Sequence, residues 1–227
     1  MGDLGAYVIP VIGTQHAGKT ELCHAIQLYL TGKYGLSAYV LDEIVRASPH
    51  KTRTQSTTQS QQFILEVEER MINALRGLFD VIIADRIFLD NCYGYWQYAA
   101  MREGLPKDVI DDHLREWGIR KTALYSNLIF HLHTFPITQE LSDGFRDMDT
   151  EFRDECDGLI AQGVKDFIGY TSTPKVVGLE SPLGKNGKEA AEDVQRRAKG
   201  VIDKELIPLF SQGLRYSPTF IMPPTPK

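Results

Sequence analysis

Residues 6–20 read AYVIPVIGTQHAGKT, an apolar run that passes directly into a glycine-bearing turn. The turn matches the pattern G-x-x-x-x-G-K-[ST] at every position: Gly13-Thr14-Gln15-His16-Ala17-Gly18-Lys19-Thr20. In this pattern the glycines let backbone N–H groups point at phosphate oxygens, the lysine adds a positive charge and the final hydroxyl reaches Mg²⁺. The motif requires a strand before it and a helix after it, and both patterns are present. We therefore expect this turn to bind the phosphates of a nucleotide.

Short apolar runs alternate with helical patterns along the rest of the chain. The runs that predict buried strands are residues 6–12, 37–41, 79–84, 126–134 and 175–179. The patterns that predict helices are residues 20–30, 63–78, 91–101, 106–118, 149–168 and 188–206. Such alternation is typical of βαβ units on a parallel sheet. The chain therefore predicts a single α/β domain over residues 1–227, with a loop at 44–62 and a proline-rich tail at 217–227.

The composition is that of an ordinary globular protein, with 42% hydrophobic and 24% charged residues. A net charge of -5 argues against general coating of nucleic acid, although a local basic patch could still bind a polyanion. The widely spaced Cys23, Cys92 and Cys156 indicate neither a disulfide framework nor a zinc site. No apolar run reaches the ~18 residues needed to cross a bilayer, and no signal-peptide pattern precedes the first strand. We expect a cytoplasmic protein without a membrane partner.

Asp85 ends the apolar run VIIAD at residues 81–85. A nucleotide-binding loop needs a second acid at the end of a neighbouring strand to hold Mg²⁺, so Thr20 and Asp85 are the predicted metal ligands. Arg86 follows, where mechanical ATPases often place a glutamate that polarises water. An arginine here suits transfer to an acceptor, with Arg86 and Asp90 as predicted acceptor contacts. The alternative is that Arg86 and Asp90 form a structural pair.

Asp42 and Glu43 end the second predicted strand, at the same sheet edge as the glycine-bearing turn. A carboxylate at this edge can accept the proton of an attacking hydroxyl or orient the acceptor. Glu43 is the preferred candidate, because Arg46 follows within one turn and could pair with it or with substrate. The alternative is a pair of exposed acids at a strand end.

A basic stretch follows these two acids. Residues 44–65 contain no Asp or Glu, but they carry Arg46, His50, Lys51 and Arg53. The positive charge predicts an anionic acceptor such as a nucleotide or a nucleic-acid strand, with Arg46, Lys51 and Arg53 as contacts. The alternative is a solvated loop that binds nothing.

Residues 143–153, DGFRDMDTEFR, predict a small helical lid that extends over about residues 136–158. Arg146 and Arg153 are seven residues apart and would face the same way on a continuing helix. Arginines in such lids close over the transferring phosphoryl group, so both are predicted nucleotide contacts, and Arg146 is also a predicted catalytic residue. The alternative for Arg153 is a surface helix balanced by its acids.

Two further groups of residues favour packing over chemistry. His131 and His133 alternate on the fourth predicted strand, but two histidines without a third ligand are more often packed than metal-bound. The aromatic residues that precede and follow Gly94 could stack on a base, although core packing fits them better. These aromatic residues are Tyr93, Tyr95, Trp96 and Tyr98.

Four segments together carry a family resemblance: GTQHAGKT at 13–20, LDEIVR at 41–46, VIIADRIFLDNCYGY at 81–95 and DGFRDMDTEFRDE at 143–155. Over about residues 6–180 the chain resembles the P-loop kinase-like family that includes nicotinamide riboside kinases. It is similar, more distantly, to thymidylate and deoxynucleoside kinases and to phage-type kinases of hydroxymethylated bases in DNA. The resemblance implies a three-layer P-loop NTPase fold with a parallel sheet in the order 2-3-1-4-5, helices on both faces, an acceptor acid near Glu43 and lid arginines near Arg146.

The residues and the resemblance together predict an ATP- and Mg²⁺-dependent kinase that moves the γ-phosphate to a nucleoside- or nucleotide-type acceptor. Lys19 and Arg146 would stabilise the transferring group, while Glu43 would act on the acceptor and Arg86 would orient it. Two alternatives stay open. One is a kinase of hydroxymethylated pyrimidines with DNA as its polymeric acceptor, and the other is a regulatory NTPase or nucleotide-sensing module without a small-molecule acceptor.

Overall fold

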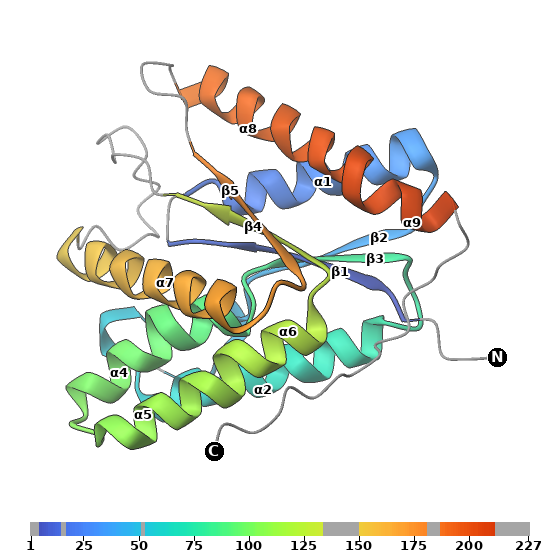
Figure 1. Ribbon diagram of the computed structural model, residues 1–227. Coiled ribbons are helices and arrows are strands. Elements are labelled where there is room, and N and C mark those ends of the chain that lie inside the picture. The colour runs from blue at the N-terminus through green and yellow to red at the C-terminus, as the bar shows by residue number, and fades with distance from the viewer. Residues whose placement is uncertain (1–4, 15–16, 51–52, 134–149, 181–186, 212–227) are drawn as a thin grey trace.

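The computed structural model describes residues 5–14, 17–50, 53–133, 150–180 and 187–211. Within them, five parallel strands form one sheet in the order β2-β3-β1-β4-β5, as the sequence predicts. The strands are β1 (Tyr7–Ile12), β2 (Ala38–Leu41), β3 (Val81–Asp85), β4 (Leu128–Leu132) and β5 (Lys175–Leu179). Helices lie on both faces of this sheet, which gives the predicted three-layer α/β architecture (Figure 1).

The helices divide into two groups by the face that they cover. One face carries α1 (Lys19–Tyr34) and a continuous helical stretch of α8 (Gly187–Val201), η6 (Ile202–Leu206) and α9 (Ile207–Ser211) (Figure 1). The opposite face carries α2 (Thr58–Leu75), α3 (Phe88–Asp90), η3 (Asn91–Trp96), α4 (Gln97–Arg102), α5 (Lys107–His113), η4 (Leu114–Arg120), α6 (Lys121–Tyr125) and α7 (Thr150–Tyr170). Two short 3₁₀ turns, η1 (Ile44–Ala47) and η2 (Arg53–Gln55), lie between β2 and α2.

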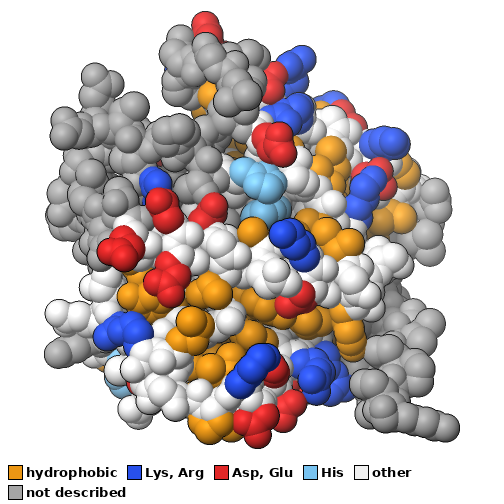
Figure 2. Space-filling model, turned by 60° about the vertical axis from the view of Figure 1, so that its left-hand side comes forward, with side chains coloured by type: hydrophobic (Ala, Val, Ile, Leu, Met, Phe, Trp, Pro, Cys, Tyr) orange, Lys and Arg blue, Asp and Glu red, His pale blue; other side chains and the backbone are white. Residues whose placement is uncertain are grey.

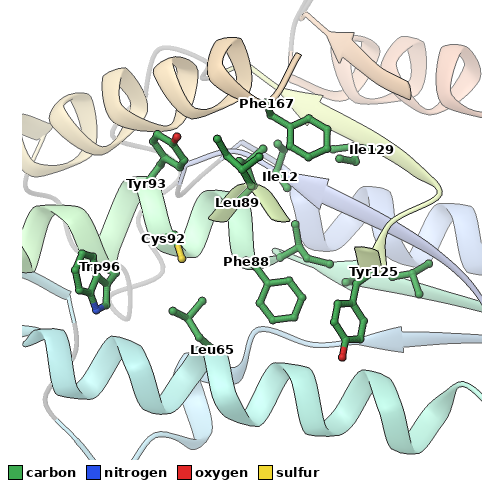
Figure 3. Packing of buried hydrophobic residues seen from close by; sticks show 14 of the residues in the cluster. Ile12, Leu65, Phe88, Leu89, Cys92, Tyr93, Trp96, Tyr125, Ile129 and Phe167 are labelled. Atoms are coloured by element: carbon green, nitrogen blue, oxygen red, sulfur yellow. The ribbon is translucent and has the colours of Figure 1, made fainter. Parts of the chain in front are cut away.

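Apolar side chains fill both interfaces between sheet and helices. All of β1 is buried, because a central parallel strand covered on both faces has no side turned to water. On the α2 face, the rings of Phe88 and Tyr125 lie 5.3 Å apart between centroids. Figure 3 shows Leu65 to the left of Phe88 and Phe167 of α7 beside Ile129 of β4. The buried β1 therefore brings the turn that follows it to a rigid position at the centre of the sheet edge.

Helix α2 begins at Thr58, inside the stretch 44–62 that the sequence predicts to be a loop. Thr57 Oγ1 accepts from the Ser60 N–H at 3.1 Å, and Ser60 Oγ accepts from the Thr57 N–H at 2.9 Å. This reciprocal capping satisfies two N–H groups at the start of the helix. The loop prediction is wrong for residues 58–62 because Ser and Thr, which favour loops, also cap helices.

The predicted lid lies mostly outside the described residues, and so does Arg146. Its last part, residues 150–158, forms the first turns of α7, which continues to Tyr170 and packs against η3. No helix among the described residues has both the length and the apolar composition needed to cross a bilayer. Cys23, Cys92 and Cys156 are buried free thiols, in agreement with the predicted absence of a disulfide framework.

Glycine lets α7 approach η3 closely. A Cβ placed on Gly163 would lie 2.5 Å from Cγ of the Tyr93 ring, well inside normal contact distance. The ring cannot easily move away, because the Tyr93 hydroxyl also donates to Asp166 Oδ2 on α7 at 3.1 Å. Gly158, one and a half turns earlier on the same helix, has no neighbour within 4 Å of its Cβ position. Substitution of Gly163 therefore tests close packing together with helix propensity, whereas substitution of Gly158 tests helix propensity alone.

We expect Gly163→Ala to lower the free energy of unfolding by about 1–3 kcal/mol, because the methyl group overpacks the contact with Tyr93. Gly158→Ala is the matched control and should raise it by up to about 1 kcal/mol, since alanine is the better helix former. Urea unfolding followed by circular dichroism measures both. Equal shifts in the two variants would show that α7 does not depend on this close contact.

Candidate active site

Two glycines of the turn between β1 and α1 have backbone conformations that favour glycine. Gly13 has a φ of 141° and Gly18 a φ of 79°, values that L side chains rarely adopt. A Cβ on Gly13 would also lie 2.5 Å from the carbonyl oxygen of Leu132 on β4. Ala17 is buried, and Gly18 is the N-cap of α1. Two of the predicted phosphate contacts lie outside the described residues: Gln15 and His16.

Lys19 lies with its ammonium group folded back onto this turn. The side chain is buried, and Nζ donates to the backbone carbonyl oxygen of Thr14 at 2.7 Å. Burial, and after it the nearby Arg86 guanidinium, lowers the pKa of Lys19. The ammonium is thus held beside the backbone N–H groups of the turn, where a phosphate oxygen could accept from both.

Thr20 and Asp85 come together across the β1–β3 pair. The Thr20 hydroxyl donates to Asp85 Oδ2 at 2.5 Å. The register pairs Val11 with Asp85, so the end of β3 lies beside the end of β1. Asp85 Oδ1 is buried and has no hydrogen-bond partner among the described residues. Two hard oxygen donors and one unused carboxylate oxygen fit Mg²⁺, which prefers carboxylate, hydroxyl and water oxygens.

Arg86 is the centre of the hydrogen bonds at this edge. Its side chain is only 5% exposed, and Nε donates to Glu43 Oε1 at 2.6 Å. Nη1 donates to the Gly13 carbonyl oxygen at 3.3 Å and to Asp90 Oδ2 at 3.5 Å. The guanidinium also lies 4.5 Å from the centroid of the Tyr95 ring. Arg86 has a φ of 89°, a strained value for a residue with a side chain, which the surrounding contacts must hold in place.

Glu43 reaches the site from the end of β2. Its side chain is 24% exposed and pairs with Arg86. The predicted contact of Arg46 with Glu43 or with substrate stays a prediction, because the side chain of Arg46 lies outside the described residues. A small pocket opens next to it, between the end of β2, α2 and η3. The lining residues are Leu41, Asp42, Glu43, Ile44, Val45, Ile64, Glu68, Asp85, Arg86 and Asn91. The structure therefore brings Asp42, Glu43 and Arg86 to one pocket, which Asp85 also lines.

Asp90 does not face this pocket. The residue is fully buried, its Oδ1 accepts from the Ile87 N–H at 2.8 Å, and its Oδ2 accepts from the Gly13 N–H at 3.4 Å. Burial raises the pKa of Asp90 to about 6, against the opposing charge of Arg86. We therefore correct the expectation of a substrate contact: Asp90 is occupied with holding Arg86 and the phosphate-binding turn, which is the structural alternative that the sequence left open.

The basic stretch is described through its backbone alone. Arg46 lies in η1 and Arg53 in η2, both between β2 and the capped start of α2. The side chains of Arg46 and Arg53, and the whole of Lys51, lie outside the described residues. Contact between this stretch and an anionic acceptor thus stays a prediction.

The start of α7 meets the phosphate-binding turn directly. The Thr14 hydroxyl donates to Asp157 Oδ1 at 3.0 Å. Arg153 lies one helical turn before Asp157 and so on the same side of α7. Its side chain is 13% exposed and pairs with Asp154 at 2.8 Å. Arg153 therefore lies on a helix that contacts the turn at residues 13–20. Its contact with a nucleotide phosphate stays a prediction.

His131 and His133 lie at the end of β4, next to the phosphate-binding turn. Their ring centroids are 4.4 Å apart, and burial followed by the charge of His133 lowers the pKa of His131 to about 4. Figure 2 shows histidine side chains at the surface near the middle of one face, with an acidic side chain beside them. Within the described part of the chain, no group of three or more possible ligands could hold a metal ion. Tyr93, Tyr95 and Trp96 are buried, as the core-packing interpretation predicts.

Sequence reasoning missed three side chains of this site. Glu68 on α2 and Asn91 on η3 both line the pocket, and Asp157 on α7 holds Thr14. Glu68 carried a readable signal, because it falls on the apolar face of α2 at helical spacing from Ile64. An acid on a buried face is rare without a role. Asn91 and Asp157 carried no such signal, since their roles depend on contacts between distant segments.

No protein-family model matches the chain, and no curated protein matches it in sequence. Among solved structures, thymidylate kinase from Ehrlichia chaffeensis is similar at a TM-score of 0.58 and 16% identity, over 87% of this chain and 99% of that one. Deoxyadenosine kinase from M. mycoides, solved with the products dCMP and dCDP, is similar at a TM-score of 0.57 and 13% identity, over 86% of this chain and 99% of that one. A NadR protein in complex with NR is similar at a TM-score of 0.61 and 16% identity, over 88% of this chain but 51% of that one. At these identities the likeness shows the fold alone: the chain has the P-loop NTPase fold of these kinases.

We expect Arg86→Lys to lower the free energy of unfolding by about 2–3 kcal/mol, because a lysine cannot contact Glu43, Gly13 and Asp90 together and leaves a buried carboxylate poorly paired. Arg115→Lys is the control, since Arg115 pairs with Asp112 on the surface, where both side chains are more than half exposed. That change should stay within about 0.5 kcal/mol. Urea unfolding measures both, and an Arg86→Lys variant as stable as the control would contradict the central role of Arg86.

Proposed function

We propose that the chain is an ATP- and Mg²⁺-dependent kinase that transfers the γ-phosphate to a nucleoside- or nucleotide-type acceptor. One observation carries the proposal: the turn at residues 13–20, the Thr20–Asp85 pair and an acidic pocket are joined by direct hydrogen bonds at one sheet edge. Thr20 bonds Asp85, and Arg86 bonds both the Gly13 carbonyl oxygen and Glu43. Ligands bind at this carboxyl edge in open α/β sheets.

The donor side uses the turn and the metal pair. The N–H groups between Gly13 and Thr20 and the start of the α1 dipole would hold the β- and γ-phosphates. Lys19 would leave its bond to the Thr14 carbonyl oxygen and donate to the γ-phosphate. Thr20 and Asp85 would hold Mg²⁺, and this ion would offset the negative charge on the phosphate oxygens. Arg153 and Arg146 are the proposed cations that close over the phosphoryl group from the lid side.

The acceptor side uses the pocket beside Glu43. The Glu43 carboxylate is fixed by Arg86 and remains partly exposed, so an acceptor hydroxyl in the pocket could donate to it. Glu43 would then take the hydroxyl proton as the oxygen attacks the γ-phosphate. Asp85 lines the same pocket, so a metal ion held by Thr20 and Asp85 would lie close to an acceptor bound there. Arg86 would act by positioning Glu43, because Nε donates to Glu43 while Nη1 donates to the Gly13 carbonyl oxygen and to Asp90.

The test is ADP release from Mg·ATP with a panel of acceptors, with products identified by mass spectrometry. The panel contains nucleosides, nucleoside monophosphates, nicotinamide riboside, and DNA with plain or hydroxymethylated pyrimidines. Stimulation by one small acceptor, with its phosphorylated product, supports the proposal. Phosphorylation of modified DNA alone would assign the polymeric acceptor instead, and slow release indifferent to every acceptor would point to a regulatory NTPase.

Glu43→Gln should reduce transfer to the acceptor by at least about 100-fold while nucleotide affinity changes little, because the amide cannot take the proton. Lys19→Ala should abolish turnover, and Asp108→Asn, which removes an exposed acid on α5, should leave both quantities unchanged. Steady-state kinetics and nucleotide binding by calorimetry separate the two effects. Equal losses of transfer and of nucleotide affinity in Glu43→Gln would contradict its role toward the acceptor.

A further inference from the structure

Glu68 is a carboxyl group buried in the proposed acceptor pocket, and it forms no ion pair with a cation among the described residues. It is 3% exposed, yet it lines the pocket with Glu43, Asp85 and Asn91. Among the described residues, its one hydrogen bond comes from Asn91 Nδ2 to Oε2, at 3.2 Å. The Arg86 guanidinium donates from Nε to Glu43 and from Nη1 to Gly13 and Asp90, and no bond from it to Glu68 is found. The other carboxyl oxygen, Oε1, therefore has no partner among these residues.

A buried carboxyl group without a cation favours its neutral form. Burial, and after it the Asp90 carboxylate, raises the pKa of Glu68 to about 8, although the Asn91 amide and the Arg86 charge oppose the rise. The charged groups that lie around it are Asp90 on α3, Arg86 and Asp85 at the end of β3, and Asp42 and Glu43 after β2. Acids outnumber cations in this set, so protonation of one carboxyl group lowers the repulsion.

A neutral carboxyl group carries one O–H donor and retains acceptor capacity on its other oxygen. The Asn91 amide already donates to Oε2, which leaves the O–H on Oε1 and the second lone pair of Oε2 for a ligand. This adjacent donor and acceptor complement a planar edge in which an acceptor atom lies next to an N–H group. Amides, lactams and aminopyrimidines have such an edge, and a carboxylate does not.

We propose that Glu68, oriented by Asn91, is the specificity-determining residue of the acceptor pocket and reads an amide-type edge of the acceptor through a donor–acceptor pair. The inference rests on the proposed function for the position of the acceptor. It deepens that function by naming the substrate class: an acceptor with a base or carboxamide that offers an N–H beside an acceptor atom. Acceptors with a carboxylate at this place are rejected, because the Asp42 and Glu43 carboxylates line the same pocket.

The experiment compares two variants at Glu68 with one on the solvent side of α2. Glu68→Gln retains a donor and an acceptor and cannot ionise, so it should bind acceptor about as well as the native protein. Glu68→Met has a similar length and no donor, and it should raise the acceptor KM by about 10- to 100-fold with little change in nucleotide affinity, as expected for loss of a hydrogen-bonding partner in a buried site. Glu66→Gln, on an acid that is 45% exposed, is the matched control and should change neither.

The pH dependence of acceptor affinity distinguishes hydrogen bonding between Glu68 and the acceptor from simple packing. In the native protein, acceptor affinity should fall as the pH rises through about 8, where Glu68 loses its proton. Glu68→Gln should remove this fall. N-methylation of the acceptor, as in 3-methyluridine against uridine or 1-methylinosine against inosine, should weaken binding to the native protein and have much less effect on Glu68→Met. Calorimetry with these nucleosides measures binding without requiring transfer.

The outcomes distinguish this inference from the proposed function. If no acceptor is phosphorylated but nucleoside binding still depends on Glu68 and on N-methylation, the proposed kinase activity is contradicted and the proposed recognition role of Glu68 is supported. If the native protein transfers phosphate and the acceptor KM of both Glu68→Met and Glu68→Gln stays within about twofold of the native value at every pH, the kinase activity is supported. The recognition role of Glu68 is then contradicted. Failure of the nucleosides in the panel to bind the native protein would overturn it as well. Urea unfolding confirms that each variant is folded.

Discussion

The guanidinium of Arg86 is buried where four segments of the chain meet. A buried cation is tolerated only when it is paired and hydrogen-bonded, and here the partners are Glu43, Asp90, the Gly13 carbonyl oxygen and the Tyr95 ring. These partners belong to the end of β2, α3, the phosphate-binding turn and η3. One charge therefore fixes the acceptor acid relative to the loop that would hold the donor phosphates. The strained backbone of Arg86 persists because all these contacts determine it together.

The acids around this cation are sorted into different tasks by their neighbours. Glu43 pairs with Arg86 and stays partly exposed, which suits contact with an acceptor hydroxyl. Asp90 accepts hydrogen bonds from backbone N–H groups. One oxygen of Asp85 accepts from Thr20, and the other has no hydrogen-bond partner among the described residues. Glu68 accepts from an amide and forms no ion pair among the described residues, and burial raises its pKa to about 8. Similar side chains thus acquire distinct chemistry from burial and hydrogen bonding alone.

Much of the fold follows from local patterns. The apolar runs identified all the strands of the described sheet to within a few residues, because parallel strands are buried on both faces. The start of α2 was missed, since Thr57 and Ser60 favour either a loop or a cap until the helix forms. At the site, the turn from Gly13 to Thr20 and the acid Asp85 were predictable, because each follows directly from a strand end. The lid could not be assessed in the same way, as residues 134–149 lie outside the described part of the chain.

By itself, the sequence determined the glycine-bearing turn at residues 13–20, the position of the second acid and the α/β class, since each depends on neighbours along the chain. Tertiary structure decided what Arg86 does: the sequence allowed either an acceptor contact or a pair with Asp90, and packing made it the link between Glu43 and Gly13. It also decided that Glu68 enters the pocket. The physical reason is that burial and hydrogen-bond partners come from segments far apart in the chain, and these set the charge and direction of a side chain.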